Sequence, residues 1–163
     1  MPAEPRSSLA AALLVGLLLG GAGAPAGAAA DEPPPVVVTR LGPVQPGAAP
    51  GQSLYLLRYR IAPGTQLPLH HHEGVQIGLV EAGELTYHVA AGAVPVYVAA
   101  ADGTSVLVRT VRAGEDARIV AGQWVVEEPD DHHWGANEGS EPLLIVTSAL
   151  LRQGAPLATR DEP

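Results

Sequence analysis

Short apolar segments rich in β-branched and aromatic residues recur about every ten residues along this chain, and turn residues separate them. These strand-like segments cover residues 53–61, 75–81, 85–90, 94–99, 104–111, 117–120, 123–126 and 142–151. Asp102 and Gly103, for example, form a hairpin signal between two of them. No segment after the first thirty residues shows a sustained helical period. Short strands at this spacing predict an all-β sandwich or barrel, which can hold an internal cavity.

Histidines mark two places in this pattern, because five of the six lie in two short clusters. The first cluster is the run from 70 to 72 within GTQLPLHHHEGVQIGLVEAG, residues 64–83. In an extended chain, side chains two apart share a face, so His70 and His72 point one way and His71 the other. Gln76 falls on the face of His70 and His72 if no bulge intervenes.

The second cluster, His132 and His133, lies in GQWVVEEPDDHHWGAN, residues 122–137, after an acidic turn that contains a proline. Each cluster begins a strand-like segment. Neutral imidazole is a good ligand for Zn, Cu, Fe and Ni. Two clusters that meet in a barrel therefore predict a metal site, although solvated runs on the surface are the simpler alternative for either cluster alone.

The first stretch resembles the first motif of the cupin superfamily, G(X)5HXH(X)3,4E(X)6G. Gly64, His70, His72, position 76 and Gly83 match every spacing of this motif. The departure is Gln76, where the family usually carries glutamate.

The second stretch resembles the second motif, G(X)5PXG(X)2H(X)3N, more loosely. Gly122 is followed by six residues before Pro129, Asp131 stands in place of a glycine, and His133 arrives one residue early. The spacing from His133 to Asn137 agrees. The resemblance covers roughly residues 54–151.

The resemblance implies a double-stranded β-helix, the cupin jelly-roll barrel, that holds one divalent metal. Carried over by position, the implied ligands are His70, His72, Gln76 and His133. Fe and Mn are the first candidates for the metal, with Zn, Ni and Cu as alternatives. Because an amide oxygen is a weak, uncharged ligand, Gln76 either binds the metal or hydrogen-bonds a bound water or substrate.

The remaining histidines are expected to lie outside the site. His71 is out of phase with its neighbours, and His132 competes with His133 but lacks the motif spacing to Asn137. His88 is expected to pack or face solvent, with a role as an inward base as the alternative. An acidic loop, expected to be solvated, is formed by Glu127, Glu128, Asp130 and Asp131.

The sequence predicts that the chain is divided into four segments. Residues 1–30 read as a signal peptide, with an apolar run at 9–19 and small residues up to an A-x-A-like site, although a retained anchor is the alternative. Residues 31–52 are expected to form an extended N-terminal arm that either pairs at a sheet edge or reaches a partner subunit. Residues 53–151 form the barrel, and residues 152–163 form a flexible C-terminal tail.

Composition limits the functions. The net charge is −8, there is no lysine, and no basic patch exists for nucleic acid or anionic lipid. No cysteine is present, so no disulfide stabilises the fold. We therefore expect a periplasmic or extracellular metal-binding cupin with no stable membrane span after cleavage.

The resemblance to quercetin-dioxygenase-like cupins implies an oxygenase that acts on a small, phenolic-like molecule. A non-catalytic module that binds a small ligand or a metal is the alternative. An isomerase or lyase would need an inward carboxylate, and none is evident in the sequence. Family behaviour also suggests a homodimer.

Overall fold

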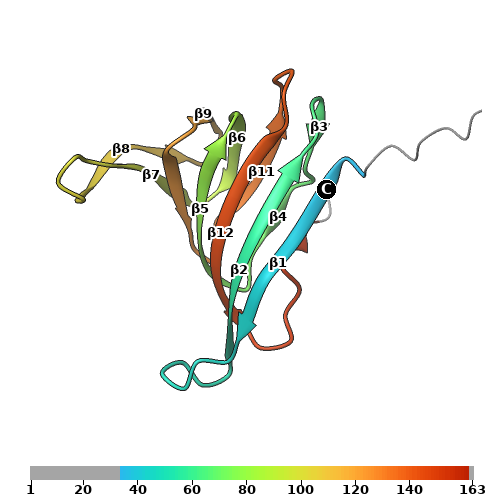
Figure 1. Cartoon of the computed structure of the whole chain (residues 1–163), viewed down its shortest axis with the longest axis vertical. Coiled ribbons are helices and arrows are strands. Elements are labelled where there is room, and N and C mark those ends of the chain that lie inside the picture. Colours follow the sequence, from blue (N-terminus) through green and yellow to red (C-terminus); the bar gives the residue numbers. More distant parts are fainter. Residues whose placement is uncertain (1–33, 162–163) are drawn as a thin grey trace, which may run out of the picture. The chain divides into compact units, whose positions relative to one another are not determined.

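The computed structural model describes residues 34–161, in which thirteen strands form two antiparallel sheets (Figure 1). The strands are β1 (Val36–Val44), β2 (Gln52–Ile61), β3 (Thr65–Gln66), β4 (His70–His71), β5 (Gly74–Ala82), β6 (Glu84–Ala91), β7 (Ala93–Ala99), β8 (Ser105–Arg112), β9 (Glu115–Val120), β10 (Gln123–Glu127), β11 (His132–Asn137), β12 (Leu143–Arg152) and β13 (Thr159–Arg160). The all-β prediction is confirmed. Residues 34–161 contain no helix that is long and apolar enough to cross a bilayer. The predicted signal peptide, residues 1–30, lies outside the described residues.

The order of the strands joins distant parts of the sequence. The seven-stranded sheet has the order β1-β2-β12-β5-β10-β7-β8, and the six-stranded sheet has the order β13-β4-β11-β6-β9, with β3 paired to β11. In Figure 1, β2, β12 and β5 lie side by side, although β12 is far from both in sequence. Because β12 is flanked on both sides, its largely apolar sequence suits its position.

Buried and more exposed side chains alternate along the strands, and the buried ones form the core between the two sheets. In β6, Leu85, Tyr87 and Val89 are buried and the residues between them are more exposed. In β9, Ala117 and Ile119 repeat this pattern. Burial of such side chains contributes roughly 1.5–3 kcal/mol each. The core is therefore built from inward-facing residues of both sheets, and polar side chains on the same faces form a site within it.

The segment expected as an N-terminal arm contributes the edge strand β1. Its register runs from Val36 opposite Ile61 to Val44 opposite Leu54. Pro43 is accommodated because an edge strand does not need every backbone N–H for pairing.

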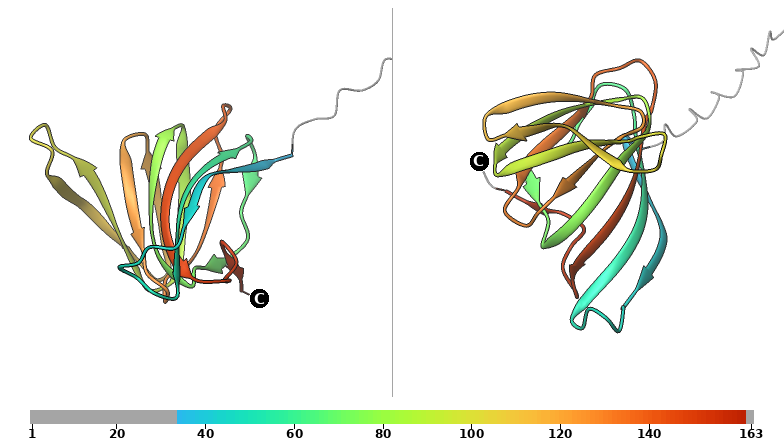
Figure 2. Two further views of the ribbon diagram at one scale, coloured as in Figure 1. Left: turned by 60° about the horizontal axis from the view of Figure 1, so that its bottom comes forward. Right: turned by 90° about the vertical axis from the view of Figure 1, so that its left-hand side faces the viewer.

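The C-terminal tail, predicted to be flexible over residues 152–163, is described over residues 152–161 and contains a short strand. Residues 159–160 form β13, which pairs with the histidine-bearing β4, and the backbone N–H of Asp161 donates to the carbonyl of Leu69 at 3.1 Å. Figure 2 shows this end of the chain folded beside β4. The polar, proline-containing sequence gave no sign of this pairing, because the hydrogen bonds come from the backbone rather than from an apolar face.

Candidate metal centre

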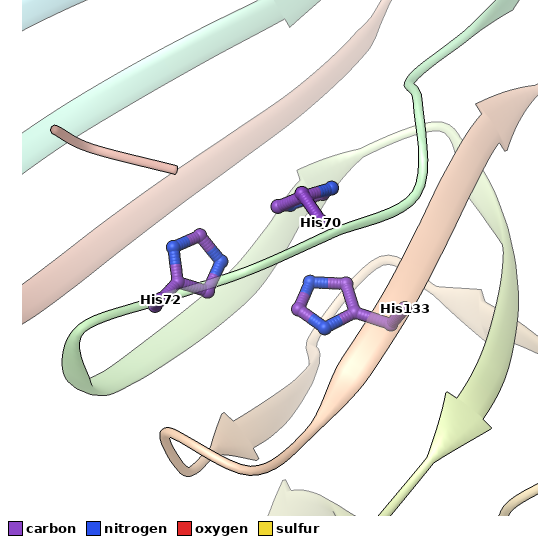
Figure 3. Close-up of side chains that lie close together, drawn as sticks. All are labelled: His70, His72 and His133. Carbon is purple, nitrogen blue, oxygen red and sulfur yellow. The ribbon is translucent and has the colours of Figure 1, made fainter. Parts of the chain in front are cut away.

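Three histidine side chains from two distant segments converge inside the barrel (Figure 3). His70 lies on β4, His72 lies just after it, and His133 lies on β11, where its backbone is the antiparallel partner of His70. Their exposed fractions are only 9%, 2% and 3%. We call these three residues the inner cluster; each offers a ring nitrogen, and these atoms lie within 4.8 Å of one another.

Backbone carbonyls fix the orientation of all three inner rings. Nδ1 of His70 donates to the Pro68 carbonyl at 2.7 Å, and Nδ1 of His72 donates to the Leu157 carbonyl at 2.7 Å. Nδ1 of His133 lies 3.2 Å from the Asp131 carbonyl. Since a carbonyl only accepts, the proton of each ring is on Nδ1 and the lone pair is on Nε2. Second partners of this kind are what orient metal-binding histidines in proteins.

A buried carboxylate, Glu127, completes the centre. It ends β10, where it is the antiparallel partner of Gln76, and it is only 4% exposed. Its oxygens lie 3.3 Å from Nε2 of His133 and 3.6 Å from Nε2 of His72. Tyr87 donates its hydroxyl to Glu127 at 2.7 Å. The family motif places a carboxylate at position 76, where this chain has glutamine. Glu127 supplies a carboxylate from the neighbouring strand β10 instead.

The prediction of a solvated acidic loop is therefore wrong for two of its residues. Asp131 is 4% exposed, like Glu127, and its carboxylate accepts from the backbone N–H groups of Ala93 and Glu128, each at 2.8 Å. These bonds hold the turn that leads from Glu127 to His133. Gly92 is required beside it, because a Cβ there would lie 2.0 Å from an Asp131 oxygen and its φ is +89°.

The electrostatics of the pocket favour neutral imidazole and ionised carboxylate. Burial lowers the pKa of His70 to about 4, and it also lowers the pKa of His72. Burial opposes ionisation of Glu127, but His133, His72 and the hydrogen bonds from Tyr87 and Gln76 together hold its pKa below the ordinary value. These are the protonation states in which such groups bind metals.

Gln76 points into the same pocket, as predicted, and its exposed fraction is 8%. Its amide nitrogen lies 2.8 Å from Nε2 of His72 and also contacts Glu127. Among the described residues, its buried Oε1 has no hydrogen-bond partner. The structure therefore brings together all four sequence-predicted ligands, His70, His72, Gln76 and His133, and adds Glu127.

The inner cluster borders a cavity of about 490 Å³ that reaches both sheets. Val38, Tyr59 and Ile145 form part of its largely apolar wall, and His70, His133, Gln76 and Glu127 form its polar end. Residues 157, 158 and 160 of the folded tail also line it. The cavity is large enough for a small organic molecule beside the cluster.

The other three histidines lie elsewhere, as the sequence predicts. His71 and His132 point away from the inner cluster, and their rings lie 4.8 Å apart. His88 stacks on Trp134, and its Nδ1 lies 2.7 Å from Asp116.

Comparison with known proteins identifies the fold. No protein-family model and no curated protein matches the sequence. Solved structures that match include a cupin 2 domain-containing protein from Halorhodospira halophila, at 14% identity over 82% of this chain and 75% of that chain, with a TM-score of 0.51. A cupin-like protein from Thermotoga maritima matches at 17% identity over 77% and 75%, with a TM-score of 0.50. The Cnp3 cupin domain from Schizosaccharomyces pombe matches at 9% identity over 71% and 64%, also with a TM-score of 0.50.

These likenesses show that the chain has the cupin fold. The double-stranded β-helix expected from the motif resemblance is thereby confirmed. Because one barrel serves many chemistries, the function must be argued from the inner cluster and its cavity.

Proposed function

We propose that the inner cluster and Glu127 hold one divalent transition metal, and that the chain is an exported oxygenase of small, phenolic-like molecules. The observation that carries this proposal is the convergence of one ring nitrogen from each of three buried histidines at the polar end of an apolar cavity, with a buried carboxylate beside Nε2 of His72 and of His133.

The described residues fit a metal. The inner rings present Nε2 because their Nδ1 protons are held by carbonyls. The lowered pKa values of His70 and Glu127 leave little competition from protons at neutral pH. The orphaned Oε1 of Gln76 is a buried acceptor that a bound water or substrate hydroxyl would satisfy.

Glu127 is a better fourth ligand than Gln76. To aim Oε1 at the cluster, the Gln76 amide must flip, and the flip would place Oε1 against the Glu127 carboxylate that its nitrogen now contacts. Two acceptors in contact repel, whereas the present orientation donates to Glu127. Gln76 thus suits the role of orienting Glu127 and a substrate, and Glu127 supplies the negative charge.

Three imidazoles and a carboxylate suit Fe or Mn, with Zn, Ni or Cu as alternatives. Such a metal would supply the redox chemistry with dioxygen. The chain's own residues would do the rest: the apolar wall excludes water around an aromatic ring, and Glu127 accepts a proton from a phenolic hydroxyl. Burial raises the pKa of Tyr87 well above its ordinary value, so this residue stays a donor to Glu127.

Glu127 also supports a second candidate. An isomerase or lyase needs an inward carboxylate as a base, and Glu127 is one. This reaction would move a proton on the substrate, or eliminate a group from it, without consuming oxygen.

One experiment separates these activities. The purified protein is loaded with Fe²⁺ or Mn²⁺ and incubated with a panel of catechols and flavonoids, while oxygen uptake and products are measured. Oxygen uptake that is lost in His72→Ala, but kept in His88→Ala, supports the oxygenase. Product formation without oxygen uptake supports the isomerase or lyase. Metal or ligand retention without turnover across the panel contradicts both and supports the binding module.

Export and self-association remain part of the proposal. The leader-like residues 1–30 support a periplasmic or extracellular location, which cell fractionation tests. For the homodimer, Leu56 and Ile77 are exposed and lie in one row across the outer face of the seven-stranded sheet, separated by Ser148. Sedimentation of wild type and of a variant carrying Leu56→Glu and Ile77→Glu tests this surface.

A further inference from the structure

A second group of potential ligands lies on the side of β4 and β11 that faces away from the inner cluster. It consists of His71, His132 and Asp161, which we call the outer cluster. Nδ1 of His71 lies 2.7 Å from one Asp161 oxygen, and Nδ1 of His132 lies 2.7 Å from the other. The three residues come from β4, from β11 and from the end of the folded tail.

The arrangement is more than a single ion pair. His88 and Asp116 show the ordinary case, in which one carboxylate meets one imidazole at 2.7 Å. In the outer cluster, one carboxylate meets two imidazoles from different strands, and one potential ligand atom from each of the three residues lies within 4.8 Å of the others. Two neutral imidazoles and a carboxylate form a donor set typical of zinc sites with an open position.

The geometry needs little change to accept an ion. Ligand atoms around a tetrahedral zinc, with bonds of about 2.0–2.2 Å, lie roughly 3.3–3.5 Å apart. The two N···O distances of 2.7 Å would therefore lengthen by roughly 0.6–0.8 Å as the ion takes the place of the two hydrogen bonds, with the proton of each neutral imidazole carried on Nε2. The side chains of His71, His132 and Asp161 are 24%, 36% and 16% exposed, so an ion can enter from solvent and keep a water ligand.

We propose that His71, His132 and Asp161 form a second metal site, which suits Zn²⁺ or a similar ion and is separate from the inner cluster. Occupation of this site would hold the tail in place. Asp161 follows closely after Leu157, whose carbonyl orients His72, and after Ala158 and Arg160, which line the cavity. The outer ion would thus stabilise one wall of the cavity and one ring of the inner cluster.

The test counts zinc ions per chain by equilibrium dialysis and elemental analysis of the full-length protein without an affinity tag. Wild type is expected to bind two ions, and Asp161→Asn one. Asp116→Asn, which changes the matched exposed His–Asp pair, is expected to bind two. His133→Ala is expected to lose the inner ion and keep the outer one, so the two sites are scored separately.

A second variant guards against a folding artefact. His132→Asn must also lose one ion, and both outer variants must keep the circular dichroism spectrum and the remaining ion of the folded protein. Two ions in Asp161→Asn overturn the outer site. A single ion in wild type that Asp161→Asn retains and His133→Ala loses overturns the outer site and leaves the inner one standing. A single ion in wild type that only the outer variants lose would support the outer site and contradict the proposal that the inner cluster binds a metal.

Discussion

The inner and outer clusters use the same residue type on the same two chain segments, yet they meet different surroundings. The inner rings are at most 9% exposed, and their Nδ1 atoms face backbone carbonyls. The outer rings, His71 and His132, are partly exposed, and their Nδ1 atoms both face the carboxylate of Asp161. Neighbouring histidines on one strand therefore differ: one ring is buried and held by a backbone carbonyl, and the next is partly exposed.

This difference explains what each cluster can do. The carbonyls leave the lone pair of each inner ring on Nε2, beside Glu127, and His70 and His133 line the largely apolar cavity. The outer rings have their Nδ1 atoms engaged by a carboxylate that solvent can reach. Under the proposed function, the inner cluster would place an ion beside a substrate, whereas the outer cluster connects the tail to β4 and β11.

The largest expected effect is on inner-site metal affinity when an inner ring is removed. If a binding free energy of roughly 10–16 kcal/mol is shared by four ligands, each contributes about 2.5–4 kcal/mol, so His133→Ala should weaken binding by roughly 60- to 700-fold. Competition with a chelator measures the dissociation constant. His88→Ala is the control, because His88 stacks outside the cavity. Equal affinities in His133→Ala and His88→Ala would contradict the proposal that the inner cluster binds the metal.

The next effect is on the free energy of unfolding of the metal-free protein. The folded pKa of His70 is lowered by burial from 6.5 to about 4, so the unfolded chain binds this proton more readily between these values. Stability should therefore fall by about 3 kcal/mol as the pH is lowered through this window. The lowered pKa of Glu127 acts in the same direction. Urea unfolding at several pH values measures this, and His70→Gln should flatten the dependence. A wild type whose stability does not change with pH over this window would show that burial is not acting on His70.

The position of the carboxylate gives a third test. Glu127→Gln should weaken inner-site metal binding by roughly 10–100-fold, since it removes the negative charge that lies beside Nε2 of His72 and of His133. The double variant Gln76→Glu with Glu127→Gln should recover much of the loss, because the two positions are paired across β5 and β10. Affinity measured by the same competition decides the matter. An unchanged Kd in Glu127→Gln would mean that the carboxylate has no part in binding.

The smallest expected effect concerns the tail. A chain that ends at residue 154 lacks the Leu157 carbonyl that orients His72, and its inner-site affinity should fall by about tenfold. A chain that ends at residue 161 is the matched control, since it keeps both Leu157 and Asp161. A truncated protein that binds the inner metal as tightly as wild type would show that His72 needs no help from the tail.

The sequence predicted the barrel and the directions of the five clustered histidines, because alternation along a strand is a local rule. It did not predict that Glu127 is inward. Glu127 is followed by three more acidic residues within four positions, which indicates a solvated loop. A usable signal was present, however: if the strand is extended by one residue, Glu127 shares its face with the buried Val125.

Asp161 could not have been found in this way. Its place depends on the backbone pairing of β13 with β4, and no side-chain pattern in the polar tail indicates that pairing. The metal-ligand roles of His70, His72, Gln76 and His133 stay predictions, and the structure adds Glu127 to them.

The most direct measurement is anomalous diffraction from crystals of the protein loaded with manganese or iron. The account predicts one ion within about 2.0–2.3 Å of Nε2 of His70, His72 and His133 and of one Glu127 oxygen, with Gln76 hydrogen-bonded beside it. An ion bound through Oε1 of Gln76 with Glu127 turned away, or an inner cluster that takes up no ion, would contradict it.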